Sequence, residues 1–152
     1  MHTDSIHSLA ELDTWVGGRL NHWNAGSIIL LSGNLGAGKT TLVRSVITQR
    51  MLALGKTVER VTSPTFVIHQ SYPEVAVEHL DLYRFENAGE AQLIEIGYYD
   101  ILQATRNCGG LCFVEWPEKA RAIGLLDADR NVSLELNADG SRTIHDRSLD
   151  GQ

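Results

Sequence analysis

From residue 33 to residue 40 the chain reads Gly33-Asn34-Leu35-Gly36-Ala37-Gly38-Lys39-Thr40, a complete match to the pattern G-x-x-x-x-G-K-[ST]. A strand-like run, Ile28-Ile29-Leu30-Leu31-Ser32, precedes it, and a helical run over residues 41 to about 54 follows. Glycines let successive backbone N–H groups turn toward phosphate oxygens, and the following helix N-terminus adds its positive dipole end. Lys39 can reach the β- and γ-phosphates, while the Thr40 hydroxyl can ligate Mg²⁺. The stretch therefore predicts binding of a nucleoside triphosphate.

The length and composition predict one ordinary globular domain. The chain has 152 residues, of which 43% are hydrophobic and 21% are charged. We expect one domain over residues 1–146 and a frayed polar tail over residues 147–152. The longest apolar runs are of strand length, and the start of the chain lacks the basic and then apolar pattern of a signal peptide. The expectation is a cytoplasmic protein without a membrane span.

Charge and cysteine content narrow the possible partners. The formal net charge of −6 argues against independent binding to nucleic acid, because such binding draws much of its affinity from Lys and Arg. Any action on RNA would then run through a partner. Cys108 and Cys112 make a poor zinc site without a nearby histidine, and we expect Cys112 in the core and no role for Cys108.

The rest of the chain predicts alternating helices and strands. A capping-box pattern at Ser8 opens a helix that we expect to close at Ala25-Gly26. Apolar residues recur along it at helical intervals, namely Leu9, Leu12, Val16, Leu20 and Trp23. The further expected elements are a short strand (58–62), a hairpin (67–72 and 75–80), helical pieces (87–96 and 98–104), a buried strand (111–114) and a second hairpin (131–136 and 142–145). This order predicts an α/β three-layer sandwich whose mixed sheet is parallel in the middle, with antiparallel hairpins toward its edges. Nucleotide would bind at the carboxyl ends of the central strands.

Two acidic residues stand where strands end. Asp81 ends the run from Val75 to Leu80, and Glu115 ends the apolar run Leu111-Cys112-Phe113-Val114. Phosphoryl transfer needs a carboxylate on the Mg²⁺ side and a group that orients the attacking water. Because Glu115 follows the more apolar strand, we assign it to the metal side, and we assign Asp81 to water.

Two further features stay open on residue chemistry alone. The loop Ser63-Pro64-Thr65-Phe66 lies between the helix that follows the glycine-rich loop and Asp81, where a hydroxyl-bearing loop can sense a γ-phosphate. An ordinary proline turn explains it equally well. Trp116 follows Glu115 and can either cover the site or pack in the core, and composition alone favours the core.

Taken together, four motifs resemble one family closely. They are Gly33-Asn34-Leu35-Gly36-Ala37-Gly38-Lys39-Thr40-Thr41, Ser63-Pro64-Thr65-Phe66, His79-Leu80-Asp81-Leu82-Tyr83-Arg84 and Val114-Glu115-Trp116-Pro117-Glu118. Their order and spacing are similar to those of the bacterial TsaE (YjeE) ATPases, which serve in making N6-threonylcarbamoyladenosine at position 37 of tRNA. The resemblance covers nearly the whole chain and departs at Asn34, where the family usually has aspartate.

The resemblance implies a cofactor set, a partner pair and residue roles. It implies ATP and Mg²⁺, hydrolysis that requires Asp81, and work with TsaB and TsaD, which carry out the transfer to tRNA. Lys39 would hold phosphates, and Thr40 and Glu115 would coordinate Mg²⁺. Nucleotide would contact Asn34, Leu35, Gly36, Ala37, Gly38, Lys39, Thr40 and Thr41. More weakly indicated contacts are Ser63 and Thr65 of the switch loop, Trp116 beside the site, and, around the base, Arg142 and the helix near Ala10 and Glu11.

Three alternative functions can be weighed against the ATPase. A small-molecule kinase usually has an arginine-rich lid, which the sequence lacks, and a GTPase would need a base-reading N-K-x-D motif, which is absent. A nucleotide-dependent assembly switch with little turnover of its own is compatible with the same motifs. Turnover measured with and without the partners separates the switch from the ATPase.

Overall fold

The structure is a computed structural model that describes residues 1–57, 67–120 and 127–149. The strands are β1 (His2–Ile6), β2 (Ile28–Ser32), β3 (His69–Tyr72), β4 (Val77–Asp81), β5 (Leu111–Glu115), β6 (Arg130–Leu136) and β7 (Arg142–Ser148). The α-helices are α1 (Leu9–Leu20), α2 (Lys39–Ala53), α3 (Glu90–Glu95) and α4 (Tyr98–Cys108), and two 3₁₀ turns are η2 (Pro73–Val75) and η3 (Pro117–Ala120).

Among the described residues, the strands form one seven-stranded sheet in the order β1-β7-β6-β2-β5-β4-β3. The four central strands β6, β2, β5 and β4 are parallel, whereas β1, β7 and β3 pair antiparallel with their neighbours. The mixed sheet with a parallel centre and antiparallel hairpins toward its edges is confirmed. Parallel strands place their carboxyl ends at one edge, and β2, β4 and β5 all end there.

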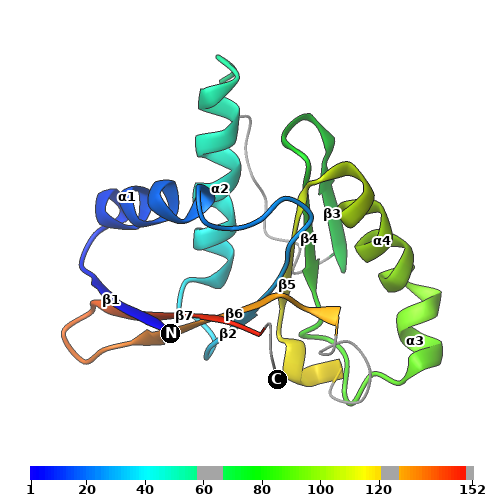
Figure 1. The fold of residues 1–152 in the computed structure, drawn as a ribbon. Coiled ribbons are helices and arrows are strands. Elements are labelled where there is room, and N and C mark those ends of the chain that lie inside the picture. Colours follow the sequence, from blue (N-terminus) through cyan, green and yellow to red (C-terminus); the bar gives the residue numbers. More distant parts are fainter. Residues whose placement is uncertain (58–66, 121–126, 150–152) are drawn as a thin grey trace.

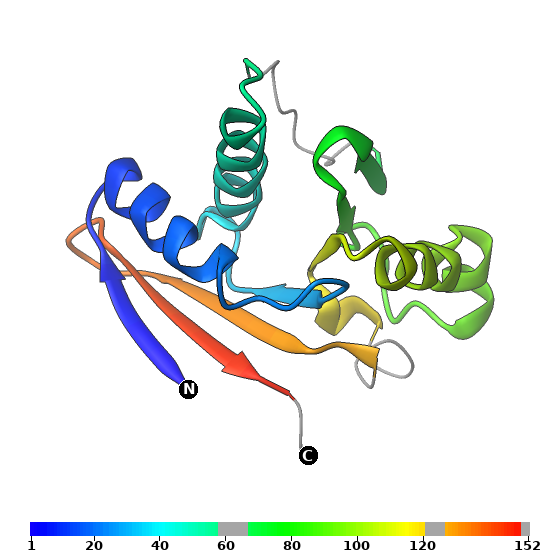
Figure 2. The same cartoon turned by 45° about the horizontal axis from the view of Figure 1, so that its top comes forward.

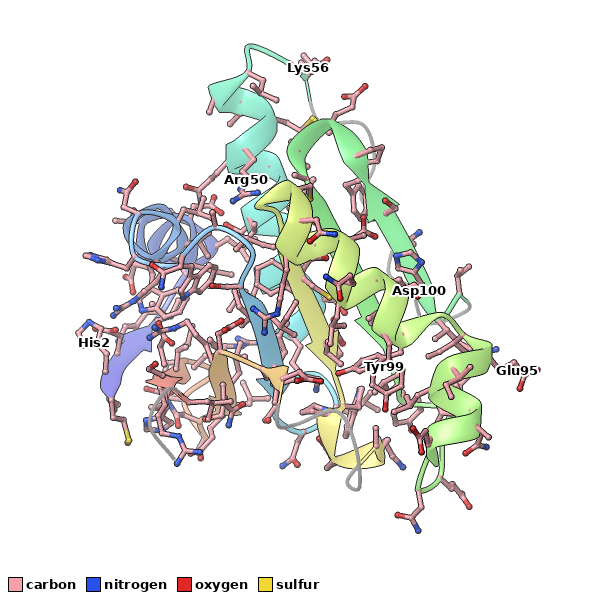
Figure 3. The ribbon with its side chains drawn as sticks, turned by 45° about the vertical axis from the view of Figure 1, so that its right-hand side comes forward. His2, Arg50, Lys56, Glu95, Tyr99 and Asp100 are labelled. Carbon is pink, nitrogen blue, oxygen red and sulfur yellow. The ribbon has the colours of Figure 1, made fainter. Side chains whose placement is uncertain are left out.

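Helices cover both faces of the sheet, which gives the predicted three layers (Figures 1 and 2). The side chains of β2 alternate, so Ile29 and Leu31 pack in the core beneath α1 and α2, while Ile28 and Leu30 pack beneath α3 and α4. Arg50, labelled in Figure 3, donates from Nη1 to the carbonyl oxygen of Val75 (2.8 Å) and ties α2 to the turn between β3 and β4. This packing fixes the start of α2 against the ends of the central strands.

The first helix begins as predicted and ends earlier. Ser8 caps it, with its side chain accepting a hydrogen bond from the Glu11 N–H (3.1 Å). The helix ends at Leu20, so the predicted extension to Gly26 is wrong. Trp23 lies at a helical interval from Leu20 only by coincidence, because it is buried from the following loop by an edge-on contact with Phe113.

The two ends of the chain differ most from the expectation. The last strand continues to Ser148, and Arg147 pairs with Asn131, so a tail that frays from residue 147 is wrong. Strand β1 was not predicted, since Ile6 is its only buried residue, and it is held by pairing with β7. The strand expected over residues 58–62 lies outside the described residues. Within residues 1–57, 67–120 and 127–149, no helix combines the length and apolar character needed to cross a membrane.

Candidate nucleotide site

The glycine-rich loop joins β2 to α2 and needs glycine at its two ends. Gly33 has φ 141°, and a Cβ there would lie 2.4 Å from the carbonyl oxygen of Leu134, closer than real Cβ contacts. Gly38 has φ 108° at the N-cap of α2, a left-handed conformation that side chains disfavour. Lys39 folds back over the loop, and its Nζ donates to the carbonyl oxygens of Gly33 (2.5 Å) and Asn34 (3.1 Å). The loop therefore has the shape predicted for phosphate binding.

Lys39 is 5% exposed, so its ammonium is largely removed from water. Burial lowers the pKa of Lys39, while the nearby acids Glu115, Glu118 and Asp81 act in the opposite direction. A buried cation that donates only to carbonyl oxygens keeps its charge available for an anion. Phosphate is the anion that this loop geometry suits.

The two predicted acids meet at the carboxyl edge of the sheet. Asp81 and Glu115 are register partners on the parallel strands β4 and β5, and the Leu82 N–H donates to the Glu115 carbonyl oxygen (3.1 Å). Asp81 is 7% exposed and Glu115 is 3% exposed. The Thr40 hydroxyl donates to Oε1 of Glu115 (2.8 Å), which joins the start of α2 to the end of β5. The structure thus brings together residues that are 75 positions apart in the chain.

The surroundings of Asp81 make its carboxylate easier to protonate than that of an exposed aspartate. Burial raises the pKa of Asp81, and the hydrogen bond that its Oδ1 accepts from the Tyr83 N–H (2.9 Å) only partly opposes this. The charge of Glu115 raises the pKa further. Among the described residues, neither Asp81 nor Glu115 forms an ion pair with a lysine or arginine. The edge of the sheet therefore carries negative charge that no cation of the described chain neutralises by direct contact.

Trp116 lies over the site as well as against the core. Its φ of 57° is unusual for a residue with a side chain and marks local strain between Glu115 and Pro117. The indole covers the Lys39 ammonium, with Nζ 4.0 Å from the ring centroid, and packs against Tyr83 at 5.0 Å between centroids. It also packs against the apolar cluster beneath α3 and α4. Composition alone favoured the core, and the geometry adds the role of a cover.

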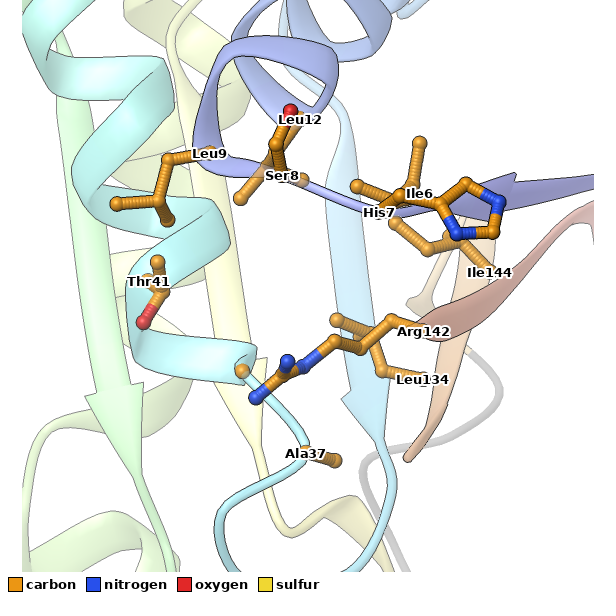
Figure 4. Close-up of a pocket in the computed structure, with 11 residues that line it drawn as sticks. Ile6, His7, Ser8, Leu9, Leu12, Ala37, Thr41, Leu134, Arg142 and Ile144 are labelled. Atoms are coloured by element: carbon orange, nitrogen blue, oxygen red, sulfur yellow. The ribbon is translucent and has the colours of Figure 1, made fainter. Parts of the chain in front are cut away.

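A pocket of about 270 Å³ opens on the other side of the loop, between the start of α1 and the last hairpin (Figure 4). Its wall is mostly apolar and is formed by Ile6, Leu9, Leu12, Ala37, Leu134 and Ile144, with Thr41 at the loop side. Arg142 extends from β7 into it, and its Nη1 donates to the Gly140 carbonyl oxygen (2.7 Å). Of the first helix, Leu9 and Leu12 line the pocket, and Ala10 and Glu11 do not.

The remaining predicted residues divide into two groups, and one residue of the site was not predicted. Leu35 is 76% exposed at the tip of the loop, and Asn34 contributes its carbonyl to Lys39 and to the Ala37 N–H. Ser63 and Thr65 lie outside the described residues. His79 was missed as a site residue, although it lies two positions before Asp81 and so on the same face of β4. That period of two is the signal that could have found it.

The donor set at this edge suits Mg²⁺ that arrives with a nucleotide. Thr40 gives its only hydroxyl proton to Glu115, so the oxygen lone pairs are left for a hard cation. Within the described residues, no group of three or more His, Cys, Asp or Glu could hold a metal alone. A hydroxyl and a carboxylate complete a Mg²⁺ site when phosphates and water supply the other ligands.

Comparisons with known proteins agree with this geometry. The family model "Threonylcarbamoyl adenosine biosynthesis protein TsaE" matches residues 6–145. A tRNA threonylcarbamoyladenosine biosynthesis protein TsaE from Treponema pallidum is 34% identical over 92% of this chain and 93% of its own length. The protein of the same name from Borreliella burgdorferi is 32% identical over 78% of this chain and 79% of its own length.

A solved structure supports the fold. The structure of Bacillus subtilus YdiB superposes with a TM-score of 0.65 and covers 97% of this chain and 85% of that chain, at 22% sequence identity. At this identity the likeness concerns the fold alone. The family follows from the sequence match: this chain belongs to the TsaE family of threonylcarbamoyl adenosine biosynthesis proteins.

Proposed function

We propose that this chain is a Mg²⁺-dependent ATPase that serves the formation of threonylcarbamoyladenosine at position 37 of tRNA. The observation that carries the proposal is the contact between the Thr40 hydroxyl and Glu115 (2.8 Å), with Asp81 beside it, next to the glycine-rich loop. Binding alone needs the loop, but hydrolysis also needs acids at the end of neighbouring strands.

Each residue of the site has a role that follows from its position. Lys39 and the backbone N–H groups of the loop bind the phosphates of ATP, and the apolar pocket beside Arg142 receives the base. Thr40 and Glu115 hold Mg²⁺, which when bound draws charge away from the transferred phosphoryl group. Asp81 orients the attacking water and can accept its proton, a task that the raised pKa of its buried carboxyl favours.

Membership of the family supports a proposal about the partners and the tRNA. Relatives carry the name tRNA threonylcarbamoyladenosine biosynthesis protein, and we propose that this chain works with TsaB and TsaD in the cytoplasm. The net charge of −6 supports contact with tRNA through these partners rather than directly.

The test has two arms. ATP hydrolysis is measured for the wild type and for Asp81→Ala, with and without TsaB–TsaD, and tRNA modification is reconstituted with this chain omitted in one arm. We expect turnover that rises with the partners, falls at least 100-fold in Asp81→Ala, and modification that stops without this chain. Turnover that ignores the partners and survives Asp81→Ala would contradict the mechanism.

An assembly switch is the second candidate, and one surface feature favours it. Leu35 and Leu136 are 76% and 54% exposed, and they line the same hollow beside the phosphate loop. An apolar rim next to the nucleotide suits a protein contact that ATP controls. Partner binding that requires ATP but persists in a variant without turnover would favour the switch.

A further inference from the structure

A buried histidine contacts the carboxylate at the centre of the site. His79 lies in the middle of β4 and is 0% exposed. It shares a face of the strand with Val77 and Asp81, and its register partner on β5 is Phe113. Its Nε2 is 2.8 Å from Oε1 of Glu115.

The partner decides which ring nitrogen carries the proton. An ionised carboxylate can only accept, so Nε2 of His79 donates to Glu115. The other nitrogen, Nδ1, is buried and has no hydrogen-bond partner among the residues that the structure describes. The neutral ring with its proton on Nε2 leaves Nδ1 as a bare acceptor, whereas any form protonated at Nδ1 would bury an N–H group without an acceptor.

A histidine is a poor choice for packing alone at this position. A buried polar atom without a partner costs stability, and native proteins contain few of them. The neighbouring inward position on the same strand, Val77, is filled by an aliphatic side chain. The bond from Nε2 to Glu115 is the contact at this position that an aliphatic side chain cannot make.

Glu115 receives two donors from two different elements. The Thr40 hydroxyl at the start of α2 and the His79 imidazole on β4 both donate to Oε1 (2.8 Å each). Thr40 belongs to the loop and helix that bind the nucleotide, so its hydroxyl has a second task when a cation is bound. His79 belongs to the rigid centre of the sheet, and its bond to Glu115 does not depend on the nucleotide.

We propose that His79 is the positioning residue of Glu115. Its imidazole fixes the carboxylate from the sheet side, so that the orientation of Glu115 does not depend on Thr40. The inference rests on the proposed function, because it takes Glu115 as the acid on the metal side. Partners of metal ligands in this position commonly change metal affinity by about 10- to 100-fold when removed.

The test compares two variants that differ in one property. His79→Leu keeps an apolar side chain and removes the donor, while His79→Gln places an amide N–H close to the position of Nε2. A fluorescent ADP analogue is titrated at increasing Mg²⁺, and the half-saturating Mg²⁺ concentration is read for each protein. We expect a rise of about 10-fold for His79→Leu and recovery to within about 3-fold of the wild type for His79→Gln. Equal values for wild type and His79→Leu, or equal impairment of both variants, would overturn the proposal.

Two controls separate the possible failures. In a Glu115→Gln background, His79→Leu should change the affinity for the ADP analogue at a fixed high Mg²⁺ concentration by less than about 2-fold, because the carboxylate that His79 is proposed to position is no longer there. An undiminished effect in that background contradicts the proposal. If the wild type shows no Mg²⁺-dependent nucleotide binding, the proposed function fails. If Mg²⁺ tightens binding to the wild type and the half-saturating Mg²⁺ concentration is the same for His79→Leu, only the role of His79 is rejected.

A measurement on the wild type covers the case in which His79→Leu does not fold. Nitrogen-15 NMR of the histidine rings reports which nitrogen carries the proton. We expect Nε2 of His79 to be protonated and Nδ1 to be bare, in the protein without nucleotide. Protonation at Nδ1 alone would mean that His79 does not donate to Glu115 and would overturn the proposal.

Discussion

Two buried carboxylates in this molecule have opposite surroundings. Asp146 on β7 is 2% exposed and is held by cations, with Arg130 Nε 2.8 Å from Oδ1 and Arg19 Nε 3.8 Å from Oδ2. The indole N–H of Trp23 also donates to it (3.3 Å). Glu115 is 3% exposed and receives hydrogen bonds from a hydroxyl and an imidazole instead.

The difference indicates which carboxylate is structural. The charge of Asp146 is neutralised inside the protein and joins α1, β6 and β7. The carboxylate of Glu115 is hydrogen-bonded, but no lysine or arginine of the described chain forms an ion pair with it. The same holds for Asp81, its register partner on β4. A pair of buried acids without a fixed cation is suited to a cation that comes from outside.

The largest expected effect is on stability and concerns Asp146, the structural carboxylate of the pair. Asp146→Ala leaves Arg130 and Arg19 without their shared acid, and we expect a loss of about 3 to 5 kcal/mol in the free energy of unfolding. Urea denaturation followed by circular dichroism measures it. A variant as stable as the wild type would mean that Asp146 is not the structural acid.

Glu115→Gln should show the opposite profile. The amide keeps the size of the side chain but loses the negative charge, so we expect ATP turnover to fall about 100- to 1000-fold with little change in stability. Steady-state hydrolysis and thermal melting measure the two quantities. Glu135→Gln, an exposed acid on β6, is the matched control and should retain wild-type turnover. Loss of stability without loss of turnover would mean that Glu115, like Asp146, has a structural role.

Asp81→Asn tests whether burial of the ionised Asp81 carboxylate lowers the stability of the fold. Burial raises the pKa of Asp81, so the folded state binds a proton more readily than the unfolded chain, and this group lowers stability as pH rises from its ordinary value of 3.8 through the raised value. The amide removes that loss and can still accept from the Tyr83 N–H. We therefore expect the melting temperature at pH 7 to rise by about 2–4 °C, as about 1 kcal/mol produces in a domain of this size.

The pH dependence supplies the control for this prediction. The gain of Asp81→Asn should shrink as pH falls through the raised pKa and should vanish below 3.8, where the aspartate becomes protonated in both states. A gain that is constant with pH, or a loss of stability at pH 7, would show that the carboxylate is not destabilised by its burial.

Arg142 is a cation without an acidic partner among the described residues, the reverse of Glu115 and Asp81. Its substitution has the smallest expected effect. Within the pocket, Arg142 donates to a carbonyl oxygen. We expect Arg142→Ala to weaken binding of a fluorescent ADP analogue about 3- to 10-fold, as loss of one hydrogen bond of ordinary strength, about 1 kcal/mol, does. Lys56→Ala removes an exposed cation remote from the pocket and should bind like the wild type. Unchanged affinity in Arg142→Ala would separate this pocket from the nucleotide.

The sequence predicted the parts of the site that follow from local rules. The glycine-rich loop, Lys39 and the acids after β4 and β5 were found because motif spacing and strand ends are visible in one dimension. The mixed sheet was predicted from its apolar central strand and from the two hairpins. The resemblance to the TsaE family then supplied roles that spacing alone leaves open.

What the sequence did not reveal depends on contacts between distant segments. Strand β1 is polar and is stabilised by pairing with β7, which a local pattern cannot show. Trp23 was placed in the first helix because it follows Leu20 by three residues, an interval that also fits a helix. In the structure, Trp23 belongs to the loop after the helix. The role of His79 required the distance to Glu115, since a lone histidine in a strand has many explanations.

The central claim is that the buried charge at Glu115 awaits a cation that arrives with the nucleotide. Isothermal titration of ATP into the wild type and into Glu115→Gln, each with and without Mg²⁺, tests it most directly. The account predicts that Mg²⁺ tightens binding to the wild type by at least about 10-fold and has little effect on Glu115→Gln. An equal gain from Mg²⁺ in both proteins would contradict it.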